Sequence, residues 1–336
     1  MLHNKYDKET LLEKLNNEDF SRVTCSFYNY LSIEDPQALR KSLYQAFAEL
    51  SVNGRIYVSY EGINAQVSVP EPHYDRFKDL LDSNEVTKGV KLRTGVQQDN
   101  QSFLKLVIKV RKYIVADGLN KDWLKFKDKG NHLKPMDFHQ IVKEKKATVI
   151  DMRNFYESEL GFFEGAVRAK AATFREEIQE VIETFKDKKD EKILLYCTGG
   201  IRCEKASAYM IEKGFTDVNQ LEGGIVEYVN EVRKHGVEPL FKGVNFVFDE
   251  RMTERVTEDI LSVCGNCGKP ADTPVNCENQ GCHVLFVQCE ECSQKFDSCC
   301  SQECQELWAK GERRESLPLF NKSLEMRKAR GLKEQQ

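Results

Sequence analysis

Hydrophobic and polar residues follow two different periods in the first third of the chain. The two-residue period of half-buried strands occurs in residues 23–30, 55–60, 64–69 and 103–112. Helical spacing occurs in residues 36–50, where Asp35 and Pro36 provide a favourable helix start, and in residues 71–82. This strand and helix order predicts two helices on one face of an antiparallel sheet, a ferredoxin-like arrangement.

The last of these strands has a basic face. Leu104, Leu106, Ile108 and Val110 alternate with the more polar positions, and no acidic residue lies between Gln101 and Tyr113. The basic residues are Lys105, Lys109, Arg111 and Lys112. The pattern fits a solvated sheet face, and it also fits a surface that follows the phosphates of a nucleic acid.

The pattern of hydrophobic residues changes in the middle of the chain, where predicted strands and helices alternate. Strands are predicted at residues 147–151, 192–196 and 217–221, and helices at 173–185, 202–213 and 224–234. Such alternation predicts a parallel sheet with helices on both faces. Ligands bind beyond the carboxyl ends of the strands in these sheets, and Cys197 lies at such an end.

These changes of pattern predict a multidomain protein that combines α+β and α/β folds. We expect a ferredoxin-like domain at residues 20–115, a linker at 116–135, an α/β domain at 136–240, a cysteine-rich module at 241–315 and a charged tail at 316–336. A chain of 336 residues is long enough for two or three domains.

The composition suits a soluble globular protein, with 40% hydrophobic and 10% aromatic residues. No run approaches the ~18 apolar residues that span a membrane, and the polar first residues do not resemble a signal peptide. We therefore expect a cytoplasmic protein, in which thiols stay reduced. The net charge of −4 argues against a wholly basic surface but allows a local basic face.

Cys197 begins the segment Cys-Thr-Gly-Gly-Ile-Arg between a predicted strand and a predicted helix. Residues 198–201, namely Thr198, Gly199, Gly200 and Ile201, can curl so that their N–H groups point at the sulfur, and Arg202 adds positive charge. A thiolate at a helix N-terminus has a lowered pKa and raised reactivity. We interpret Cys197 as a nucleophile and this loop as an anion or persulfide site. The alternative is a buried, inert cysteine.

Several neighbours of this loop are also candidates for a role. Cys203 is either a packing residue in the first helical turn or a thiol that resolves a persulfide on Cys197. We interpret Asp151, Arg153 and Glu157 as members of structural ion pairs.

Nine of the twelve cysteines lie between Cys264 and Cys304. Short Cys-x2-Cys spacings set two thiolates around one metal ion, and eight thiolates would make two closed, structural zinc sites. The favoured pairing places Cys264, Cys267, Cys289 and Cys292 on one ion and Cys277, Cys282, Cys300 and Cys304 on the other, with Cys299 left over. Pairing of adjacent cysteines, a ligand from His283, a metal-free cluster and disulfides are the alternatives.

Residues 130–235 resemble a single rhodanese domain. The resemblance rests on residues 149–153, on the loop of Cys197 and on residues 221–225, in that order. Rhodanese sulfur carriers have four residues between the cysteine and the arginine, whereas related phosphatases have five. This chain has four, so the resemblance implies sulfur or persulfide chemistry.

Residues 20–315 as a whole resemble the bacterial rhodanese-type tRNA uridine hydroxylases. The resemblance rests on residues 60–64, on Tyr196 to Ala206 and on the pair Cys299 and Cys300. It implies an oxidoreductase that uses molecular oxygen to hydroxylate C5 of the wobble uridine, with Cys197 at the active site, working through a persulfide. The partner would be the anticodon region of tRNA, whose unstacked bases could meet Tyr57 or Tyr60. The sequence has no flavin, haem or 2-His-1-carboxylate motif that would explain oxygen activation.

Two other functions fit the same motifs. A plain sulfurtransferase would use the same nucleophile to move sulfane sulfur to a thiol or a tRNA acceptor. An RNA-binding scaffold with an inactive rhodanese domain is the non-enzymatic alternative, although the intact Cys197 and Arg202 argue against it.

Overall fold

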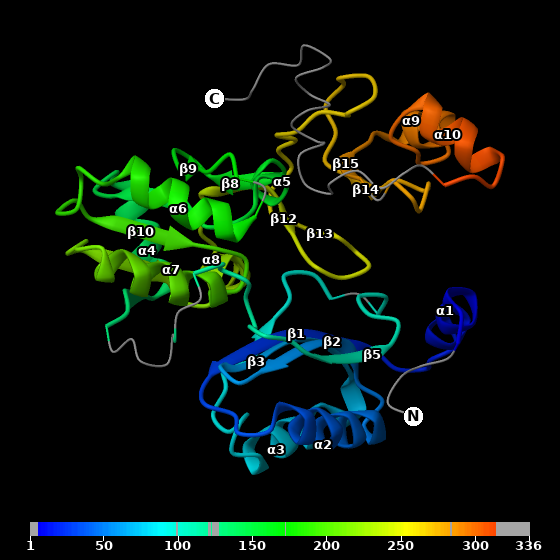
Figure 1. The fold of residues 1–336 in the computed structure, drawn as a ribbon, viewed down its shortest axis with the longest axis horizontal. Helices are drawn as coiled ribbons and strands as arrows, with labels where there is room; N and C mark the ends of the chain where they lie inside the picture. Colours follow the sequence, from blue (N-terminus) through cyan, green and yellow to red (C-terminus); the bar gives the residue numbers. More distant parts are fainter. Residues whose placement is uncertain are drawn as a thin grey trace.

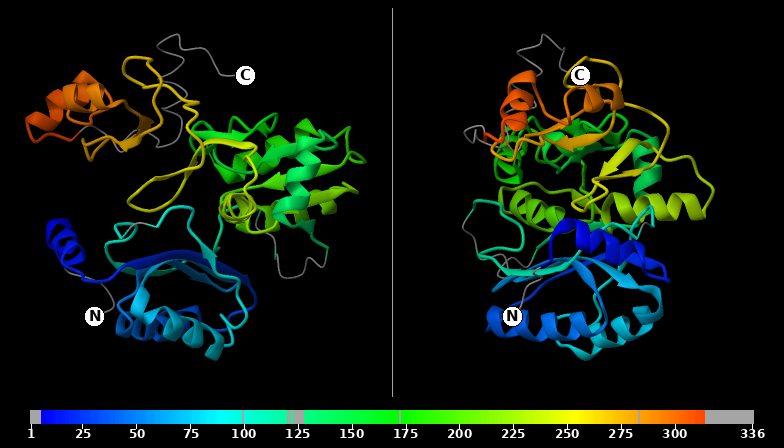
Figure 2. Two further views of the ribbon diagram at one scale, coloured as in Figure 1. Left: turned by 180° about the vertical axis from the view of Figure 1, so that it is seen from behind. Right: turned by 90° about the vertical axis from the view of Figure 1, so that its right-hand side faces the viewer.

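The computed structural model describes residues 6–98, 100–119, 122, 128–171, 173–282 and 284–313. It has an N-terminal sheet with helices on one face, a central parallel sheet between helices, and a small C-terminal module rich in cysteines (Figures 1 and 2). The predicted tail at 316–336 and His283 lie outside the described residues. Among the described residues, no helix is both long enough and apolar enough to cross a membrane.

The N-terminal sheet has the strand order β4-β1-β3-β2-β5. Its strands are β1 (Arg22–Tyr30), β2 (Asn53–Ser59), β3 (Gly62–Pro70), β4 (Arg93–Thr94) and β5 (Leu106–Val110). A helix, α1 (Lys8–Asn16), precedes them. The pairs β1–β3, β2–β3 and β1–β4 are antiparallel, which completes the predicted ferredoxin-like arrangement of four strands.

The prediction of the fourth strand of the ferredoxin-like arrangement was wrong. Residues 103–112 were expected to form this strand, but the two-residue β4 forms it. The basic segment instead forms β5, a fifth strand that lies parallel to β2 at the opposite edge. A strand of two residues is too short to show a period, so the sequence could not reveal it.

Helices α2 (Pro36–Glu49) and α3 (Tyr74–Ser83) cover one face of this sheet, and a short 3-10 turn, η1 (Glu71–His73), precedes α3. The carboxylate of Asp35 caps α2 by accepting from the N–H groups of Gln37 and Ala38, as its position predicts. Phe27 of β1 packs against Phe77 of α3 in the apolar layer between sheet and helices. The opposite face of the sheet is turned toward the rest of the protein (Figure 1).

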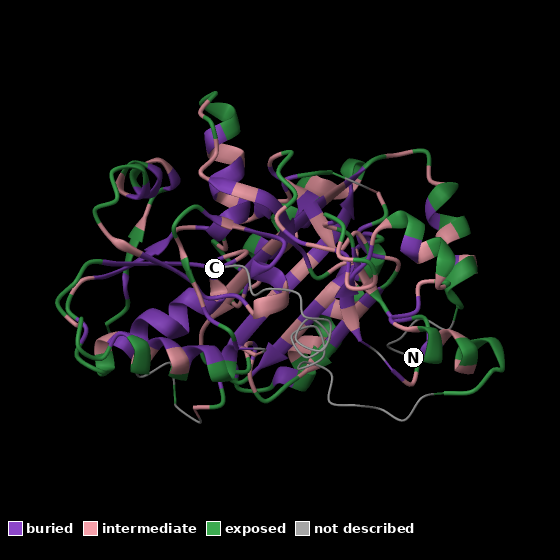
Figure 3. Cartoon of the chain, turned by 90° about the horizontal axis from the view of Figure 1, so that it is seen from above, coloured by how far each residue is buried: buried purple, intermediate pink, exposed green. Residues whose placement is uncertain are grey.

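The central sheet is parallel throughout and has the order β6-β11-β10-β7-β9. Its strands are β6 (Asn131–Leu133), β7 (Thr148–Asp151), β9 (Val167–Arg168), β10 (Ile193–Tyr196) and β11 (Val218–Leu221). Helices α4 (Pro135–Lys143) and α8 (Gly224–Lys234) pack on one face, and α6 (Phe174–Thr184) and α7 (Ile201–Glu212) on the other. This is the predicted parallel α/β domain, and its strands β10 and β11 are buried along their whole length. Figure 3 shows how the buried residues, in purple, gather on the strands and on the inner faces of the helices.

A three-stranded sheet follows the parallel sheet and leads to the cysteine module. It has the order β13-β12-β8 and consists of β8 (Gly161–Phe163), β12 (Phe241–Phe246) and β13 (Thr253–Arg255). A short helix, α5 (Phe155–Ser158), precedes β8. The module itself contains the hairpin of β14 (Pro274–Asn276) and β15 (Leu285–Val287) and the helices α9 (Glu290–Lys295) and α10 (Gln302–Ala309).

Candidate active site and metal-binding module

Cys197 directly follows β10, and the loop after it leads into α7. Gly200 has a φ of 93°, a conformation open to glycine, and it directs its N–H group to Sγ of Cys197 at 3.1 Å. The loop is supported from α8, where the N–H of Ile225 donates to the carbonyl oxygen of Cys197 at 3.0 Å. A Cβ atom on Gly224 would lie 2.5 Å from that same oxygen, so only glycine allows this contact.

The environment of Cys197 favours the thiolate. Burial raises the pKa of the thiol, but a hydrogen bond from the Cys203 side chain, the positive charge of Arg202 and nearby N–H groups together lower it to about 6. The pKa of Cys203 is raised well above its usual value, chiefly by burial and then by its bond to Cys197. Cys203 is therefore placed as an S–H donor to the Cys197 thiolate.

Arg202 acts on this thiolate from a fixed position. Its guanidinium group makes two hydrogen bonds to the carboxylate of Glu157, at 2.6 and 2.8 Å, and both side chains are buried. Glu157 on α5 thus holds the guanidinium group in place, and the charge of Arg202 helps to lower the pKa of Cys197.

Asp151 and Arg153 form a second buried ion pair below the loop. Nε of Arg153 lies 2.8 Å from Oδ1 of Asp151, and the hydroxyl of Tyr196 donates to Oδ2 at 2.7 Å. Both charged side chains are fully buried. They hold the ends of β7 and β10 together and do not reach the Cys197 sulfur, in agreement with a structural role.

Glu177 on α6 is a buried acid that the sequence did not single out. Neither of its carboxyl oxygens has a hydrogen-bond partner among the described residues, and the residue is 0% exposed. Burial raises the pKa of Glu177 well above its usual value, and the charges of Glu157 and Cys197 act in the same direction. Burial therefore favours the neutral form of Glu177, although the nearby charge of Arg202 acts in the opposite direction.

A cavity of about 430 Å³ opens between the Cys197 loop and the outer face of the N-terminal sheet. The loop contributes Cys197, Thr198, Gly199, Ile201 and Arg202. The sheet contributes polar and aromatic side chains: Thr24, Ser26, Tyr28, Arg55, Tyr57, Asn64, Gln66 and Arg93. A volume of this size is typical of small-molecule sites, so the cavity can hold one small substrate group next to the thiolate.

Two tyrosines of β1 connect the sheet to the loop and helix of Cys197. The hydroxyl of Tyr28 donates to Oε1 of Glu204 at 3.1 Å, and the hydroxyl of Tyr30 donates to the carbonyl oxygen of Ile201 at 3.3 Å. Neither tyrosine was a candidate in the sequence, because nothing in the chain order places β1 beside a helix about 170 residues later. The alternation of polar residues in β1 was the only local signal of a second functional face.

The four basic residues of the β5 segment lie on the surface, and two of them neighbour a residue that lines the cavity. Lys105, Lys109, Arg111 and Lys112 are all exposed. Arg111 lies over the ring of Tyr57, 5.8 Å from its centroid, and Tyr57 lines the cavity. The structure thus places the basic segment beside the cavity, while Tyr60 is exposed and does not line it.

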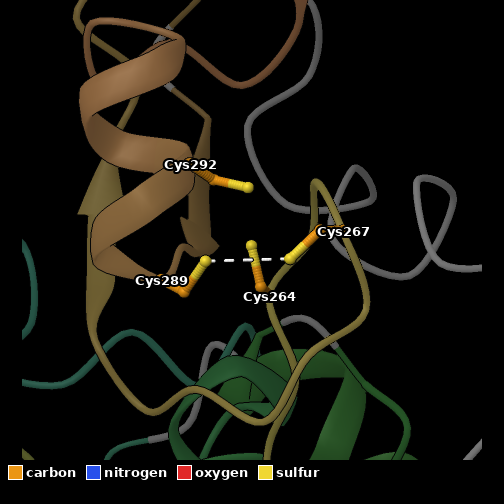
Figure 4. Close-up of side chains that lie close together, drawn as sticks. All are labelled: Cys264, Cys267, Cys289 and Cys292. Atoms are coloured by element: carbon orange, nitrogen blue, oxygen red, sulfur yellow. Dashed lines mark hydrogen bonds between the residues drawn. The ribbon is translucent and has the colours of Figure 1, made fainter.

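The cysteines of the C-terminal module form two groups of four that could each hold a metal ion. The first group is Cys264, Cys267, Cys289 and Cys292, and the second is Cys277, Cys282, Cys300 and Cys304. Within each group the sulfur atoms all lie within 4.8 Å of one another. Figure 4 shows the four sulfur atoms of the first group turned toward a common centre.

The sulfur distances suit a tetrahedral thiolate site. Zn–S bonds of about 2.3 Å imply S···S distances of about 3.8 Å in a tetrahedron. The sulfurs of Cys267 and Cys289 are 3.7 Å apart, and those of Cys282 and Cys300 are 3.6 Å apart. Cys299 is buried and belongs to neither group. The buried amide of Gln288 donates to the carbonyl oxygens of Cys292 and Cys299, which connects the two halves of the module.

Comparison with known protein families divides the chain into three parts. The UPF0176 acylphosphatase like domain matches residues 22–114, the rhodanese-like domain matches residues 134–231, and the rhodanese C-terminal family matches residues 242–305. The solved structure of a rhodanese-related protein from Thermoplasma volcanium is similar over 30% of this chain and 92% of its own, with 24% identity and a TM-score of 0.26.

Curated relatives match nearly the whole chain. A protein of Leptospira interrogans is 49% identical over 304 residues, which cover 90% of this chain and 83% of the relative. A protein of Enterobacter sp. is 48% identical and covers 91% and 88%, and one of Salmonella newport is 43% identical and covers 96% and 95%. All three relatives are named tRNA uridine(34) hydroxylase.

Proposed function

The chain belongs to the tRNA uridine(34) hydroxylase family, and we propose on that premise that it hydroxylates C5 of the wobble uridine of tRNA. The family expected from the sequence is thereby confirmed. The protein is an oxidoreductase that modifies tRNA, and the proposal adds the reacting residue, the position on the ring and the co-substrate.

Cys197 is the reacting residue in this proposal. The observation that carries it is a buried thiol with a pKa of about 6 that lines a cavity of about 430 Å³. A thiolate is the nucleophilic form of cysteine, and this one is ionised at neutral pH. The loop N–H groups can hold either the thiolate of Cys197 or the terminal sulfur of a persulfide formed on it.

Molecular oxygen is the proposed source of the hydroxyl group; its second oxygen atom leaves as water, which takes two electrons from an external reductant and two protons. The residues of this chain would bind and orient the uridine, keep water away from it and hold the sulfur in its charged form. Glu177 belongs to the same buried cluster, and its burial, which raises its pKa, favours the protonated form that could supply a proton.

The two cysteine groups are proposed as structural zinc sites. Eight thiol ligands in two closed groups leave no coordination position for a substrate, which is typical of structural zinc. Metal binding would stabilise a segment that has few apolar residues of its own, because the site does not exist in the unfolded chain and binding energy is therefore folding energy.

Lys105, Lys109, Arg111 and Lys112 are proposed to contact tRNA phosphates. They are exposed and lie on or beside β5 at one edge of the N-terminal sheet, where Lys109 and Arg111 neighbour the cavity residue Tyr57. We also propose the domain limits 20–115, 136–240 and 241–315, with a linker at 116–135, and a cytoplasmic location, where tRNA is modified.

The experiment compares purified wild-type protein with Cys197→Ser on unmodified tRNA in the presence and absence of oxygen. Mass spectrometry of the digested tRNA should show oxygen-dependent 5-hydroxyuridine at the wobble position with the wild-type protein, and none with Cys197→Ser. Full activity of Cys197→Ser would exclude the proposed role of Cys197. A product that gains sulfur in place of oxygen would support the sulfurtransferase alternative.

A further inference from the structure

Arg93 is a buried arginine that lines the cavity from β4 and is 8% exposed. Among the described residues, its Nη1 donates to the carbonyl oxygen of Lys91 at 3.5 Å and no carboxylate lies within ion-pair distance of it. The charges of Glu222 and Glu227, which do not line the cavity, act on Arg93 from further away. The guanidinium group therefore keeps N–H donors for an anionic ligand in the cavity.

The other arginines of the cavity differ from Arg93. Arg202 is held by Glu157, and Arg251 is held by the carboxylates of Asp249 and Glu254. Arg55 also has no carboxylate partner among the described residues and donates to the carbonyl oxygen of Phe248 at 3.2 Å. Among the described residues, the two cavity arginines that form no ion pair therefore both come from the N-terminal sheet, opposite the Cys197 loop.

The surroundings of Arg93 suit a nucleotide better than a simple anion. Its guanidinium group lies over the ring of Tyr28, 4.7 Å from the centroid, and Tyr57 and two amide side chains line the same face. Proteins that read unpaired RNA combine aromatic rings, on which bases stack, with amides that bond to the base edges and arginines that bind phosphate. Single-stranded RNA brings a base and a phosphate together, so it matches both features.

We propose that the outer face of the N-terminal sheet binds the wobble nucleotide, with Arg93 holding a phosphate next to that nucleotide while the base enters the cavity toward Cys197. The inference rests on the proposed function and deepens it, because it assigns the substrate-binding surface to a domain other than the one that carries the nucleophile. Tyr28 forms the wall against which the base packs, and its hydroxyl group is fixed by Glu204.

The test measures the affinity of an anticodon stem-loop RNA for wild-type protein, Arg93→Gln and Arg93→Lys. Arg76→Gln is the matched control, because Arg76 is exposed on α3 on the helix side of the same domain. Each protein is tested with the natural RNA and with RNAs that carry a neutral methylphosphonate on the 5′ or the 3′ side of the wobble nucleotide.

A hydrogen-bonded charge pair of this kind contributes about 1.5–3 kcal/mol, so Arg93→Gln should weaken binding of the natural RNA by roughly 10- to 100-fold. One of the two methylphosphonates should weaken binding to wild-type protein similarly but should cause no further loss with Arg93→Gln. Arg93→Lys should bind the RNA more weakly than wild type but should still depend on that phosphate. Lysine keeps the positive charge but lacks the planar guanidinium group that can make two parallel hydrogen bonds. Arg76→Gln should bind like wild type.

Equal losses from methylphosphonate in wild-type protein and Arg93→Gln would overturn the proposal, and so would unchanged binding by Arg93→Gln. Binding is measured separately from hydroxylation, so these outcomes leave the proposed function standing. Conversely, failure of the wild-type protein to hydroxylate tRNA would contradict the proposed function, but it would not change whether the loss of binding caused by the methylphosphonate depends on Arg93. The alkylation rate of Cys197 should be the same in all four proteins, which shows that the active-site loop is intact.

Discussion

The ammonium group of Lys205 lies 2.9 Å from Oε1 of Glu61, although the two residues belong to different domains. Glu61 lies in the turn between β2 and β3, and Lys205 lies on α7, the helix that follows the Cys197 loop. Asp117 also accepts from Lys205 at 2.7 Å, and Lys205 is 1% exposed. This buried ion cluster joins the N-terminal sheet to the nucleophile-bearing helix and so fixes the two walls of the cavity.

Replacing Lys205 by methionine should therefore destabilise the protein strongly. Glu61 and Asp117 would stay buried without their cation, a change that typically costs about 3–5 kcal/mol. Denaturant unfolding of Lys205→Met and wild type measures the loss. Lys213→Met is the control, because Lys213 lies directly after the same helix and is exposed. A loss as small as that of the control would show that the cluster does not hold the domains together.

The reactivity of Cys197 should follow the ionisation of a thiol with a pKa of about 6. The rate of alkylation by iodoacetamide, followed on the peptide that contains Cys197, should rise with pH and reach half of its maximum near pH 6. Cys203→Ala should move this midpoint upward, because the thiolate loses a hydrogen-bond donor. Cys25 is an internal reference, since burial raises its pKa to about 12. A midpoint near pH 9 for Cys197 would contradict the lowered pKa.

Glu157→Gln should lower the free energy of unfolding and should also lower the pKa of Cys197. The variant leaves the charge of buried Arg202 without its carboxylate, so the free energy of unfolding should fall by up to about 3–5 kcal/mol. The same uncompensated charge should lower the pKa of Cys197 further, because an unpaired cation favours the thiolate more strongly. The two quantities are measured by denaturant unfolding and by the pH dependence of alkylation. A rise in the pKa of Cys197 would show that Arg202 has left its position.

Glu177→Gln should stabilise the protein relative to wild type, and the difference in stability should grow as the pH rises. The pKa of Glu177 is raised in the folded state, so its contribution to stability is complete below the unfolded pKa and is lost as the pH rises toward the folded value. Glutamine keeps the neutral shape and removes this loss. The melting temperatures of Glu177→Gln and wild type should be similar near pH 4 and should differ increasingly above it.

Glu183→Gln is the control for Glu177, because Glu183 lies on the same helix but is exposed and paired with exposed Lys186. Its effect on the melting temperature should be small at every pH. An equal effect of pH on both variants would show that Glu177 is ionised in the folded protein.

Removal of metal should unfold the C-terminal module. Elemental analysis of gently purified protein should find two zinc ions per chain, and strong chelators should make residues 264–304 sensitive to proteases. Cys300→Ser should lower the content to one ion, whereas Cys299→Ser should leave two, because Cys299 belongs to neither group. An equal loss in both variants would contradict the assignment of ligands, and a protein without zinc would exclude the zinc sites.

Much of the local chemistry can be predicted from the sequence, because the groups concerned lie close together in the chain. The Cys197 loop needs only a strand end, two glycines and a following helix, all within residues 193–212. Each Cys-x2-Cys pair likewise points two thiols in one direction, and the favoured pairing is the one in which the structure groups the cysteines. The ferredoxin-like and parallel α/β folds were recognisable from periods that repeat over several residues, but the two-residue β4 was not.

The tertiary structure alone decided how distant residues meet. The guanidinium group of Arg202 binds the carboxylate of Glu157, which lies 45 positions earlier in the chain. The ammonium group of Lys205 binds the carboxylate of Glu61, which lies 144 positions earlier. Tyr28 and Arg93 lie in strands at one edge of a sheet, and only the docking of that sheet against α7 brings them to Cys197. Periodicity shows which face of an element is buried, but it does not show which other element covers that face. The ion pairs Arg202–Glu157 and Lys205–Glu61 form because a buried ion is stable only where the fold places an opposite charge beside it.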